Sequence, residues 1–276
     1  MNQDGSIYHL GLTPEEISDN IIVVGDPSRV KEVSKYFDTI ELQKEKREFV
    51  THTGTFQGKR ITAISSGMGT DNVEILFTEL DALASIDLEN RTIKEEKRKL
   101  NIVRAGTSGA LQPDIPNGSL LASDYGIGLD TLMYFYQLKS NDFEKKVADS
   151  LERSAKLPFK PYCVKGSQHL KEQFGEGMII GNTVTCPGFY APQGRILRLP
   201  LNLPDLIQNL NQFRLDQDFR ITNFEMETAG YYAMARLLDH EMLSVNAIVA
   251  NRITNEFVEN AGEVVDEMIR LILNRF

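Results

Sequence analysis

The sequence is poor in the residues that hold small proteins together covalently. It has two cysteines in 276 residues, Cys163 and Cys186, and neither belongs to a Cys-x-x-Cys pair or a cysteine–histidine cluster. A disulfide framework and a zinc site are therefore excluded, and we expect two reduced thiols. The length instead allows a sizeable core, in one large α/β domain or two smaller ones.

Basic residues are outnumbered by acidic ones. There are 30 lysines and arginines against 39 aspartates and glutamates, a formal net charge of -9. This is the wrong sign for binding nucleic acid over a broad basic surface, so phosphate recognition, if present, must be local. The sequence also lacks a signal-like N-terminus and any run of eighteen apolar residues. We therefore expect a cytoplasmic protein that does not enter membranes.

Familiar nucleotide and hydrolase motifs are missing as well. No G-x-x-x-x-G-K-[ST] sequence occurs, and Gly67-Met68-Gly69 lacks the third glycine of a dinucleotide fingerprint. Residues 106–109 (GTSG) do not match the G-x-S-x-G pattern of a nucleophile elbow. These absences disfavour an ATP-binding protein, an NAD-dependent enzyme and a serine hydrolase.

What the sequence does contain is an alternation of short apolar runs with segments of helical period. This alternation predicts a sheet with helices on its faces. The predicted strands are 21–24, 49–56, 61–65, 101–104, 119–123, 178–180, 221–224 and 243–250, with helices after residue 29, from residue 70 and over 264–272. The polar segment 87–99 is expected to be a solvated helix end or an insertion. Without a repeat or linker, a single domain over residues 1–276 is the simpler interpretation.

Two arginines stand where predicted strands end, the place where open α/β sheets bind ligands. Residues 25–29 (GDPSR) form a turn after the first strand that suits an anion, although an ordinary Asp-Pro turn with a surface arginine is the alternative. Arg104 ends an apolar strand beside an expected GTSG loop and needs an anionic partner, which an internal carboxylate would also supply. Arg47, before the strand that begins at Phe49, is a third candidate for anion binding, and on its own it is more typical of a surface arginine.

Two acidic residues follow a later strand. Glu225 and Glu227 flank Met226 and precede a predicted helix that starts at Thr228. In an extended segment both carboxylates lie on one side, and a carboxylate can accept hydrogen bonds from the two hydroxyls of a diol. The alternative is that they stabilise the N-terminus of the helix.

Residues 188–195 (GFYAPQGR) form a loop with an aromatic ring, an amide and a guanidinium. Phe189, Gln193 and Arg195 are the kinds of group that recognise a planar base, although such a loop is often only a connection. His9 lies beside a turn signal and would not be selected unaided.

Seven segments distributed over the chain form a recognisable set. They are YHLGLT (8–13), VVGDPSRV (23–30), REF (47–49), SSGMGTDN (65–72), VRAGTSGAL (103–111), FYAPQGR (189–195) and NFEMETAG (223–230). The set resembles the nucleoside phosphorylase family, and within it the uridine phosphorylases. The resemblance covers nearly the whole chain and implies a single-domain, three-layer α/β/α fold with a mixed central sheet.

The resemblance also implies a role for each residue of the site. The phosphate would be held by Gly25, Arg29, Arg104 and Thr107, with Arg47 of a neighbouring subunit. The ribose would be held by Met226 and Glu227, with His9 of the same neighbour, and the uracil by Phe189, Gln193 and Arg195. Arg104, Arg195 and Glu227 are the expected catalytic residues. Some family members bind a potassium ion between subunits at positions that match Glu48, Met68 and Asn72, where Asn72 replaces a more usual serine.

The implied reaction is reversible attack of inorganic phosphate on the anomeric carbon of uridine or deoxyuridine, without a cofactor. Purine-specific relatives carry an aspartate after the late strand, where this chain has Ala250-Asn251-Arg252, and this favours a pyrimidine. Pro192 and the long segment 87–99 depart from the family pattern. The neighbour's residues require at least a homodimer, and a homohexamer is expected. A water-using nucleosidase of the same fold and a catalytically silent nucleoside-binding protein are the alternatives.

Overall fold

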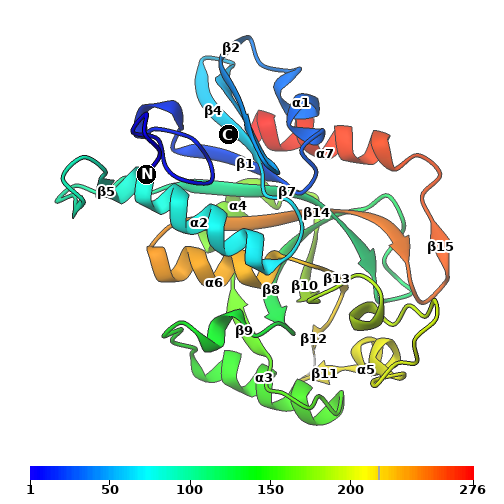
Figure 1. The fold of residues 1–276 in the computed structure, drawn as a ribbon. Helices are drawn as coiled ribbons and strands as arrows, with labels where there is room; N and C mark the ends of the chain where they lie inside the picture. The colour runs from blue at the N-terminus through cyan, green and yellow to red at the C-terminus, as the bar shows by residue number, and fades with distance from the viewer. Residues whose placement is uncertain (217) are drawn as a thin grey trace.

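The computed structural model describes residues 1–216 and 218–276, and within them an eleven-stranded mixed sheet forms the centre of the molecule (Figure 1). Its strands are β1 (Asn20–Val24), β2 (Thr39–Lys46), β3 (Phe49–Phe56), β4 (Lys59–Ser65), β7 (Asn101–Ala110), β8 (Leu120–Gly128), β9 (Tyr162–Lys165), β10 (Ile179–Thr185), β13 (Asn223–Glu225), β14 (Glu241–Asn251) and β15 (Glu256–Phe257). The order is β15-β14-β8-β10-β13-β7-β1-β4-β3-β2, with β9 on β8.

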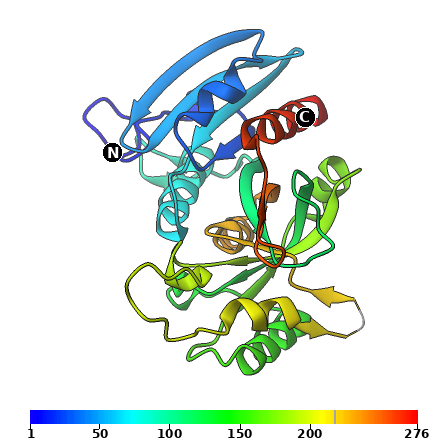
Figure 2. The ribbon, with the colours of Figure 1, turned by 90° about the vertical axis from the view of Figure 1, so that its right-hand side faces the viewer.

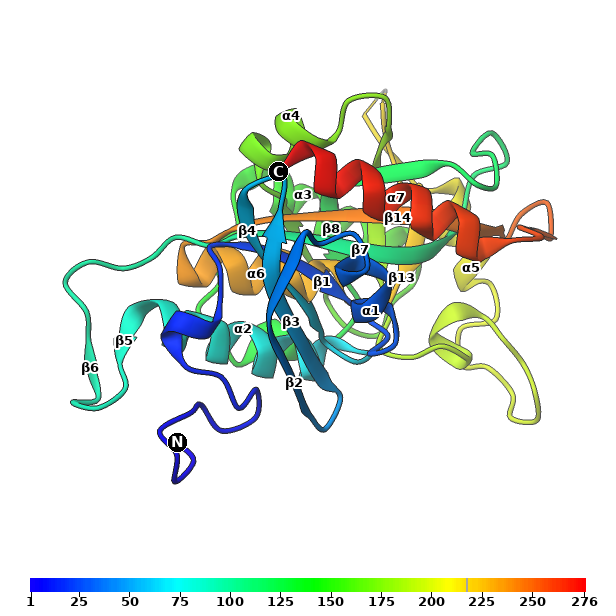
Figure 3. The same cartoon turned by 90° about the horizontal axis from the view of Figure 1, so that it is seen from above.

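Helices cover both faces of this sheet, as the alternating pattern predicts. Helices α2 (Thr70–Ser85) and α6 (Thr228–Leu238) pack against each other on one face, while α1 (Arg29–Ser34), α4 (Gln168–Phe174) and α7 (Ala261–Arg275) cover the other (Figure 3). Helices α3 (Asp142–Ser154) and α5 (Leu206–Gln212) enclose a third apolar cluster, at the end of the molecule opposite strands β2–β4 (Figure 2). The predicted three-layer α/β/α class with a mixed sheet is confirmed.

Strand β7 closes part of the sheet on itself. Besides β1, it pairs in parallel with β14 and, at Gly109 and Ala110, antiparallel with β13. The five strands β14, β8, β10, β13 and β7 therefore form a closed ring. The expectation of a flexible GTSG loop is wrong, because these residues continue β7. Gly109 leaves the space that this needs, since a Cβ there would lie 3.2 Å from the Phe224 ring.

Smaller elements complete the chain. They are the hairpins β5 (Ile86–Asp87) with β6 (Thr92–Ile93) and β11 (Arg214–Leu215) with β12 (Phe219–Arg220), and the 3-10 turns η1 (Pro14–Glu16), η2 (Leu132–Tyr134) and η3 (Ala191–Gln193). The polar segment 87–99 thus contains an exposed hairpin rather than a helix end, and α1 stops at Ser34, short of Phe37. Cys163 and Cys186 are buried free thiols. Among the described helices, none has the length and apolarity needed to cross a bilayer.

Candidate active site

A cavity of about 780 Å³ opens where several strands of the sheet end. Its walls come from the carboxyl-terminal ends of β1, β4, β7, β13 and β14, together with the segment around η3. This is where open α/β sheets bind ligands. The predicted residues that line it are Gly25, Arg29, Arg104, Thr107, Phe189, Gln193, Arg195, Met226 and Glu227, along with Glu48, Met68 and Asn72.

Arg29 and Arg104 place two positive charges in the wall of the cavity. Arg29 starts α1 directly after the GDPS turn, and its Nη1 donates a long hydrogen bond of 3.5 Å to the Ala105 carbonyl. Among the described residues no carboxylate forms an ion pair with it. Burial lowers the pKa of Arg29, and the positive charge of Arg104 lowers it further. An anion between the two guanidinium groups would relieve this repulsion.

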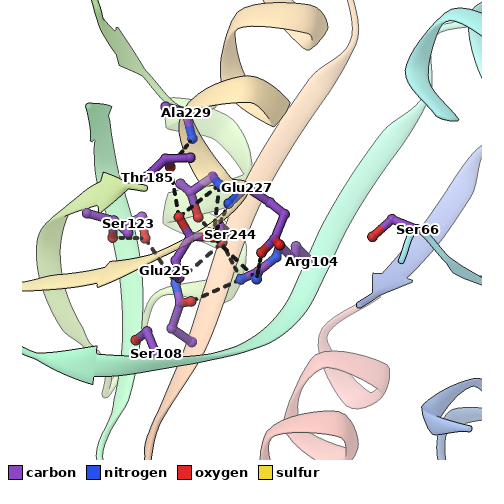
Figure 4. A network of polar contacts seen from close by, with 12 residues as sticks. Ser66, Arg104, Ser108, Ser123, Thr185, Glu225, Glu227, Ala229 and Ser244 are labelled. Atoms are coloured by element: carbon purple, nitrogen blue, oxygen red, sulfur yellow. Dashed lines mark hydrogen bonds and ion pairs between the residues drawn. The ribbon is translucent and has the colours of Figure 1, made fainter. Parts of the chain in front are cut away.

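Arg104 is buried, with only 4% of its surface exposed, and it contacts two carboxylates (Figure 4). Its Nη2 lies 2.6 Å from Glu227 Oε2 and 3.2 Å from Glu225 Oε2. Burial alone would lower the pKa of Arg104, but the two carboxylates outweigh burial and raise it. The internal salt bridge considered from the sequence therefore exists, and it forms part of the cavity wall.

The two acidic residues have different tasks. Glu225 accepts from the backbone N–H groups of Glu227 and Thr228, at 2.9 Å each, so it stabilises the start of α6. Glu227 accepts from Arg104 and from the Gly69 N–H at 2.9 Å. Burial and the charge of Glu225 raise the pKa of Glu227, against the effect of Arg104. The helix-terminus alternative thus holds for Glu225, whereas Glu227 is the carboxylate that faces the arginine.

The segment around the η3 turn presents an amide and a guanidinium to the same cavity. Arg195 Nη1 donates to Gln193 Oε1 and to the Phe189 carbonyl, and its guanidinium carbon lies 3.7 Å from the centre of the Phe189 ring. Arg252 Nη1 donates to the Gln193 carbonyl at 3.1 Å. Pro192 fits this turn, because its fixed φ suits the start of a 3-10 helix. Burial and the charge of Arg252 lower the pKa of Arg195.

Asn251, at the end of β14, does not line the cavity. Its Nδ2 donates to the carbonyls of Gln112 and Ile115, and its Oδ1 accepts from the Ile253 and Thr254 N–H groups. All its hydrogen-bonding capacity therefore holds a loop in place. An acidic side chain that would protonate a purine is absent from this position.

His9 and Arg47 lie away from the cavity of their own chain. Both contact Tyr8: the His9 ring packs edge-on against it at 4.7 Å between centroids, and Arg47 lies 6.0 Å from its centre. Glu79 of α2 holds this segment, accepting from the His9 and Leu10 N–H groups and contacting His9 Nδ1 at 2.7 Å. The two residues expected to serve a neighbouring subunit therefore occupy one place on the surface.

Glu48, Met68 and Asn72 all line the cavity, and Asn72 Nδ2 donates to the Met68 carbonyl at 3.3 Å. A cation shared between subunits at these positions stays a prediction. Among the described residues there is no group of three histidine, cysteine, aspartate or glutamate side chains arranged to hold a metal ion.

Several residues around the site were not singled out from the sequence. Arg252 supports the η3 turn, Glu79 supports His9, and Ser244 and Asn246 of β14 contact Arg104. A signal exists for the last two, because Ser244 and Asn246 are polar side chains two residues apart in the apolar middle of a strand. Residues two apart in a strand lie on the same face, here the face opposite to Leu243, Val245 and Ala247.

Comparison with known proteins gives a consistent result. The family model of the Phosphorylase superfamily matches residues 19–276. A uridine phosphorylase of Thermococcus kodakarensis is 28% identical, over 98% of this chain and 88% of the relative, and a purine nucleoside phosphorylase of Oceanobacillus iheyensis is 24% identical over 96% and 97%. The crystal structure of a Trypanosoma brucei nucleoside phosphorylase that shows uridine phosphorylase activity superimposes with a TM-score of 0.90 at 25% identity, over 100% of this chain and 98% of its own. The chain therefore belongs to the phosphorylase superfamily, in the nucleoside phosphorylase family of pentosyltransferases.

Proposed function

We propose that the protein is a uridine phosphorylase, which converts uridine or deoxyuridine and inorganic phosphate into uracil and (deoxy)ribose 1-phosphate. The observation that supports this most directly is that all these groups line one cavity. Two arginines and a hydroxyl (Arg29, Arg104 and Thr107) share it with the amide of Gln193 and the guanidinium of Arg195. Glu227 contacts Arg104, which places a carboxylate beside one of the arginines.

The charges that develop during the reaction match the groups that line the cavity. A phosphate oxygen attacks the anomeric carbon as the bond to the uracil N1 breaks, so positive charge grows on the sugar and negative charge on the leaving base. Phosphate held by Gly25, Arg29, Arg104 and Thr107 stabilises the sugar cation from below. Gln193 and Arg195 donate hydrogen bonds to the uracil oxygens that strengthen as the base gains charge. Phe189 offers a ring for stacking.

The ribose is assigned to Met226 and Glu227. A carboxylate accepts from two neighbouring hydroxyls, which orients the sugar above the phosphate. In this proposal Glu227 orients the ribose and does not act as a general acid. Arg104 links the two sites, because it contacts Glu227 and lines the same cavity.

A pyrimidine is favoured over a purine by the end of β14. A departing purine is assisted by protonation of its five-membered ring, and Asn251 is engaged in holding a loop. Uracil can leave as an anion held by Arg195 and Gln193. The relationship to a purine nucleoside phosphorylase makes inosine the substrate against which this preference is measured.

The active unit is proposed to be a homodimer, within a hexamer. His9 and Arg47 gather around Tyr8 outside their own cavity, as expected if they complete the site of a neighbour. In this assembly Arg47 reaches the phosphate and His9 the ribose. No cofactor and no cation enters a step of the reaction, which belongs to the salvage of pyrimidine nucleosides in the cytoplasm. An active monomer at assay concentration would contradict this arrangement.

One assay separates the candidate functions. Uracil release from uridine is measured with and without inorganic phosphate, with inosine in parallel. Phosphate-dependent release of uracil, faster than release of hypoxanthine, supports the proposal. Release without phosphate indicates a nucleosidase, faster release of hypoxanthine indicates a purine enzyme, and no release indicates a binding protein.

A further inference from the structure

Two polar residues, Ser244 and Asn246, are buried in the apolar middle of β14. Ser244 and Asn246 have no exposed surface, and their neighbours Leu243, Val245 and Ala247 belong to the core beneath α4 and α7. Burying an asparagine side chain is costly unless its amide is fully hydrogen-bonded. The partners of Asn246 therefore show what its amide does.

One partner is Arg104. In the parallel pairing of β14 with β7, Ser244 lies beside Arg104 and Asn246 beside Gly106. The guanidinium lies across Gly106, because a Cβ at that position would come within 1.9 Å of Arg104 Nη1. Nη1 donates to Asn246 Oδ1 at 3.0 Å and to Ser244 Oγ at 3.4 Å.

The other partners form a chain of hydrogen bonds around the closed ring of strands. Asn246 Nδ2 donates to Ser123 Oγ of β8 at 3.1 Å, and this hydroxyl lies 2.6 Å from Thr183 Oγ1 of β10. Thr183 donates to Asn223 Oδ1 of β13 at 2.8 Å, and Asn223 Nδ2 donates to Ser108 Oγ of β7 at 2.9 Å. The chain thus passes through β14, β8, β10 and β13 and returns to β7. Figure 4 shows Ser108, Ser123 and Ser244 gathered around Arg104 and the two glutamates.

The direction of donation along this series of hydrogen bonds fixes the orientation of the Asn246 amide. Thr183 donates its proton to Asn223, so the Ser123 hydroxyl donates to Thr183 and accepts from Asn246. If the amide were turned over, its NH₂ group would face the N–H groups of Arg104, and Ser123 would lose its donor. The carbonyl oxygen of Asn246 must therefore face the arginine.

The five N–H groups of Arg104 differ in their hydrogen-bond partners. Nη1 donates to Asn246 and Ser244, and Nη2 lies against Glu227 and Glu225. Nε is buried and has no hydrogen-bond partner in the described structure. The other four N–H groups are therefore held by protein partners, and the one contact to a neutral amide oxygen comes from Asn246.

We propose that Asn246 is a positioning residue for the phosphate site: anchored by Ser123, its amide oxygen fixes the rotation of the Arg104 guanidinium and so holds this charge against the cavity that is proposed to bind the anion. The inference deepens the proposed function and rests on it, since it concerns how the same site holds its phosphate. Asn246 itself does not touch the substrate.

The test compares Asn246→Ala with the wild-type enzyme and with Thr62→Val. Thr62 of β4 is equally buried and hydrogen-bonded to the Ser18 N–H, but has no contact with Arg104. Binding of inorganic phosphate is measured by calorimetry without nucleoside, and kcat and both KM values are measured with uridine. For Asn246→Ala we expect the Kd and the KM for phosphate to rise about tenfold, the effect of one hydrogen bond to a charged group, with the KM for uridine within about twofold. Thr62→Val is expected to lower Tm only.

Two further variants extend the test. Asn246→Asp keeps the volume of the side chain, so it is expected to fold even if the alanine variant does not, and its added negative charge weakens phosphate binding by about tenfold or more. Ser123→Ala frees the amide and is expected to weaken binding by about threefold. Unchanged phosphate binding in Asn246→Asp, or equal losses in Asn246→Ala and Thr62→Val, would overturn the inference. If the wild type binds phosphate but releases no uracil, the proposed function fails while the positioning role is still measured by the Kd.

Discussion

Two buried glutamates, Glu227 and Glu144, pair with arginines at the same closest distance but in different surroundings. In the cavity, Arg104 Nη2 lies 2.6 Å from Glu227, and on the scaffold, Arg236 Nη2 of α6 lies 2.6 Å from Glu144 of α3. Glu144 also accepts from the N–H groups of Lys165 and Asn141. Burial would raise the pKa of Glu144, but Arg236 and these N–H groups outweigh burial and lower it.

The Arg104–Glu227 pair differs because one N–H group of its arginine has no hydrogen-bond partner among the described residues. Burial and the nearby Glu225 raise the pKa of Glu227, and Arg104 keeps a donor without a partner. A buried ion pair is a weak source of stability when its charges are not fully hydrogen-bonded. The comparison indicates that the Glu144 pair joins α3 to α6, whereas the Glu227 pair forms part of a cavity wall and is less completely hydrogen-bonded.

The largest expected effect on the reaction rate comes from replacing Arg104. Arg104→Gln removes a preorganised cation beneath the sugar, and we expect kcat/KM for phosphorolysis of uridine to fall about 10²- to 10³-fold. The protein should still fold, because glutamine retains an amide donor near Glu227. Steady-state kinetics with a thermal unfolding curve measure both effects.

The matched control is Arg236→Gln, which breaks the other pair. Its rate should stay close to that of the wild type, while the free energy of unfolding falls by about 2 kcal/mol because Glu144 loses a charged partner. If Arg236→Gln loses activity as strongly as Arg104→Gln, the division into a scaffold pair and a site pair is wrong.

The next effect concerns the carboxylate of the site. Glu227→Gln keeps the shape but loses charge-assisted hydrogen bonds of about 1.5–3 kcal/mol each, a fall of about 10- to 100-fold in kcat/KM for uridine. For 2′-deoxyuridine, which lacks one of the hydroxyls, we expect a smaller loss. The preference for uridine over deoxyuridine should therefore narrow.

Glu32→Gln, which changes an exposed carboxylate paired with Lys35, serves as the control for this variant. It should leave both rates unchanged. If Glu227→Gln discriminates between the two nucleosides as the wild type does, contact between Glu227 and the 2′-hydroxyl is unsupported.

A smaller effect is expected at the η3 turn. Gln193→Ala removes the amide that is proposed to read the uracil edge, and turnover of uridine should fall about tenfold. Inosine makes different contacts, so its turnover should fall less and the ratio of uridine to inosine cleavage should decrease. An unchanged ratio would remove Gln193 from base recognition. The exposed Gln173→Ala is the matched control.

The sequence predicted the positions of the site well where polar residues follow apolar strands. Gly25 and Glu227 follow the ends of β1 and β13, and both line the cavity. Arg104 lines it too, but the expectation that it ends a strand is wrong, because β7 continues to Ala110. The same local rule misjudged the GTSG segment. Its glycines are typical of a loop, but here they make room within a strand for the Arg104 and Phe224 side chains, a requirement that only the tertiary structure reveals.

Strand β2 and the contact between Asn246 and Arg104 could not be predicted from local sequence patterns. Strand β2 is mostly exposed and rich in charged residues, and it is a strand because it pairs with β3 at the edge of the sheet. Asn246 stands 142 residues from Arg104, so their contact depends on the pairing of β7 with β14. Sequence periodicity gives the face on which a side chain lies, but it does not give the residue on the adjacent strand.

The smallest expected effect is on stability, and it concerns the scaffold pair. Because the pKa of Glu144 is lower in the folded protein than its ordinary value of 4.5, the folded state favours the charged carboxylate. Its contribution to stability is therefore present above pH 4.5 and is lost as the pH falls through the folded value. Glu144→Gln places an amide NH₂ against the donors of Arg236 and Asn141, and we expect it to lower the free energy of unfolding by about 1–3 kcal/mol at pH 7.

The pH dependence separates this charge effect from a simple packing defect. In urea unfolding followed by circular dichroism between pH 3 and pH 7, the difference between the wild type and Glu144→Gln should be constant near neutrality and shrink below about pH 4.5 as Glu144 takes up its proton. A difference that persists unchanged at pH 3 would mean that the variant disturbs packing and that the charge of Glu144 contributes little. Glu227→Gln should not show this acid loss, because the pKa of Glu227 is raised in the folded state, and burying its charge gives no stability at neutral pH for acid to remove.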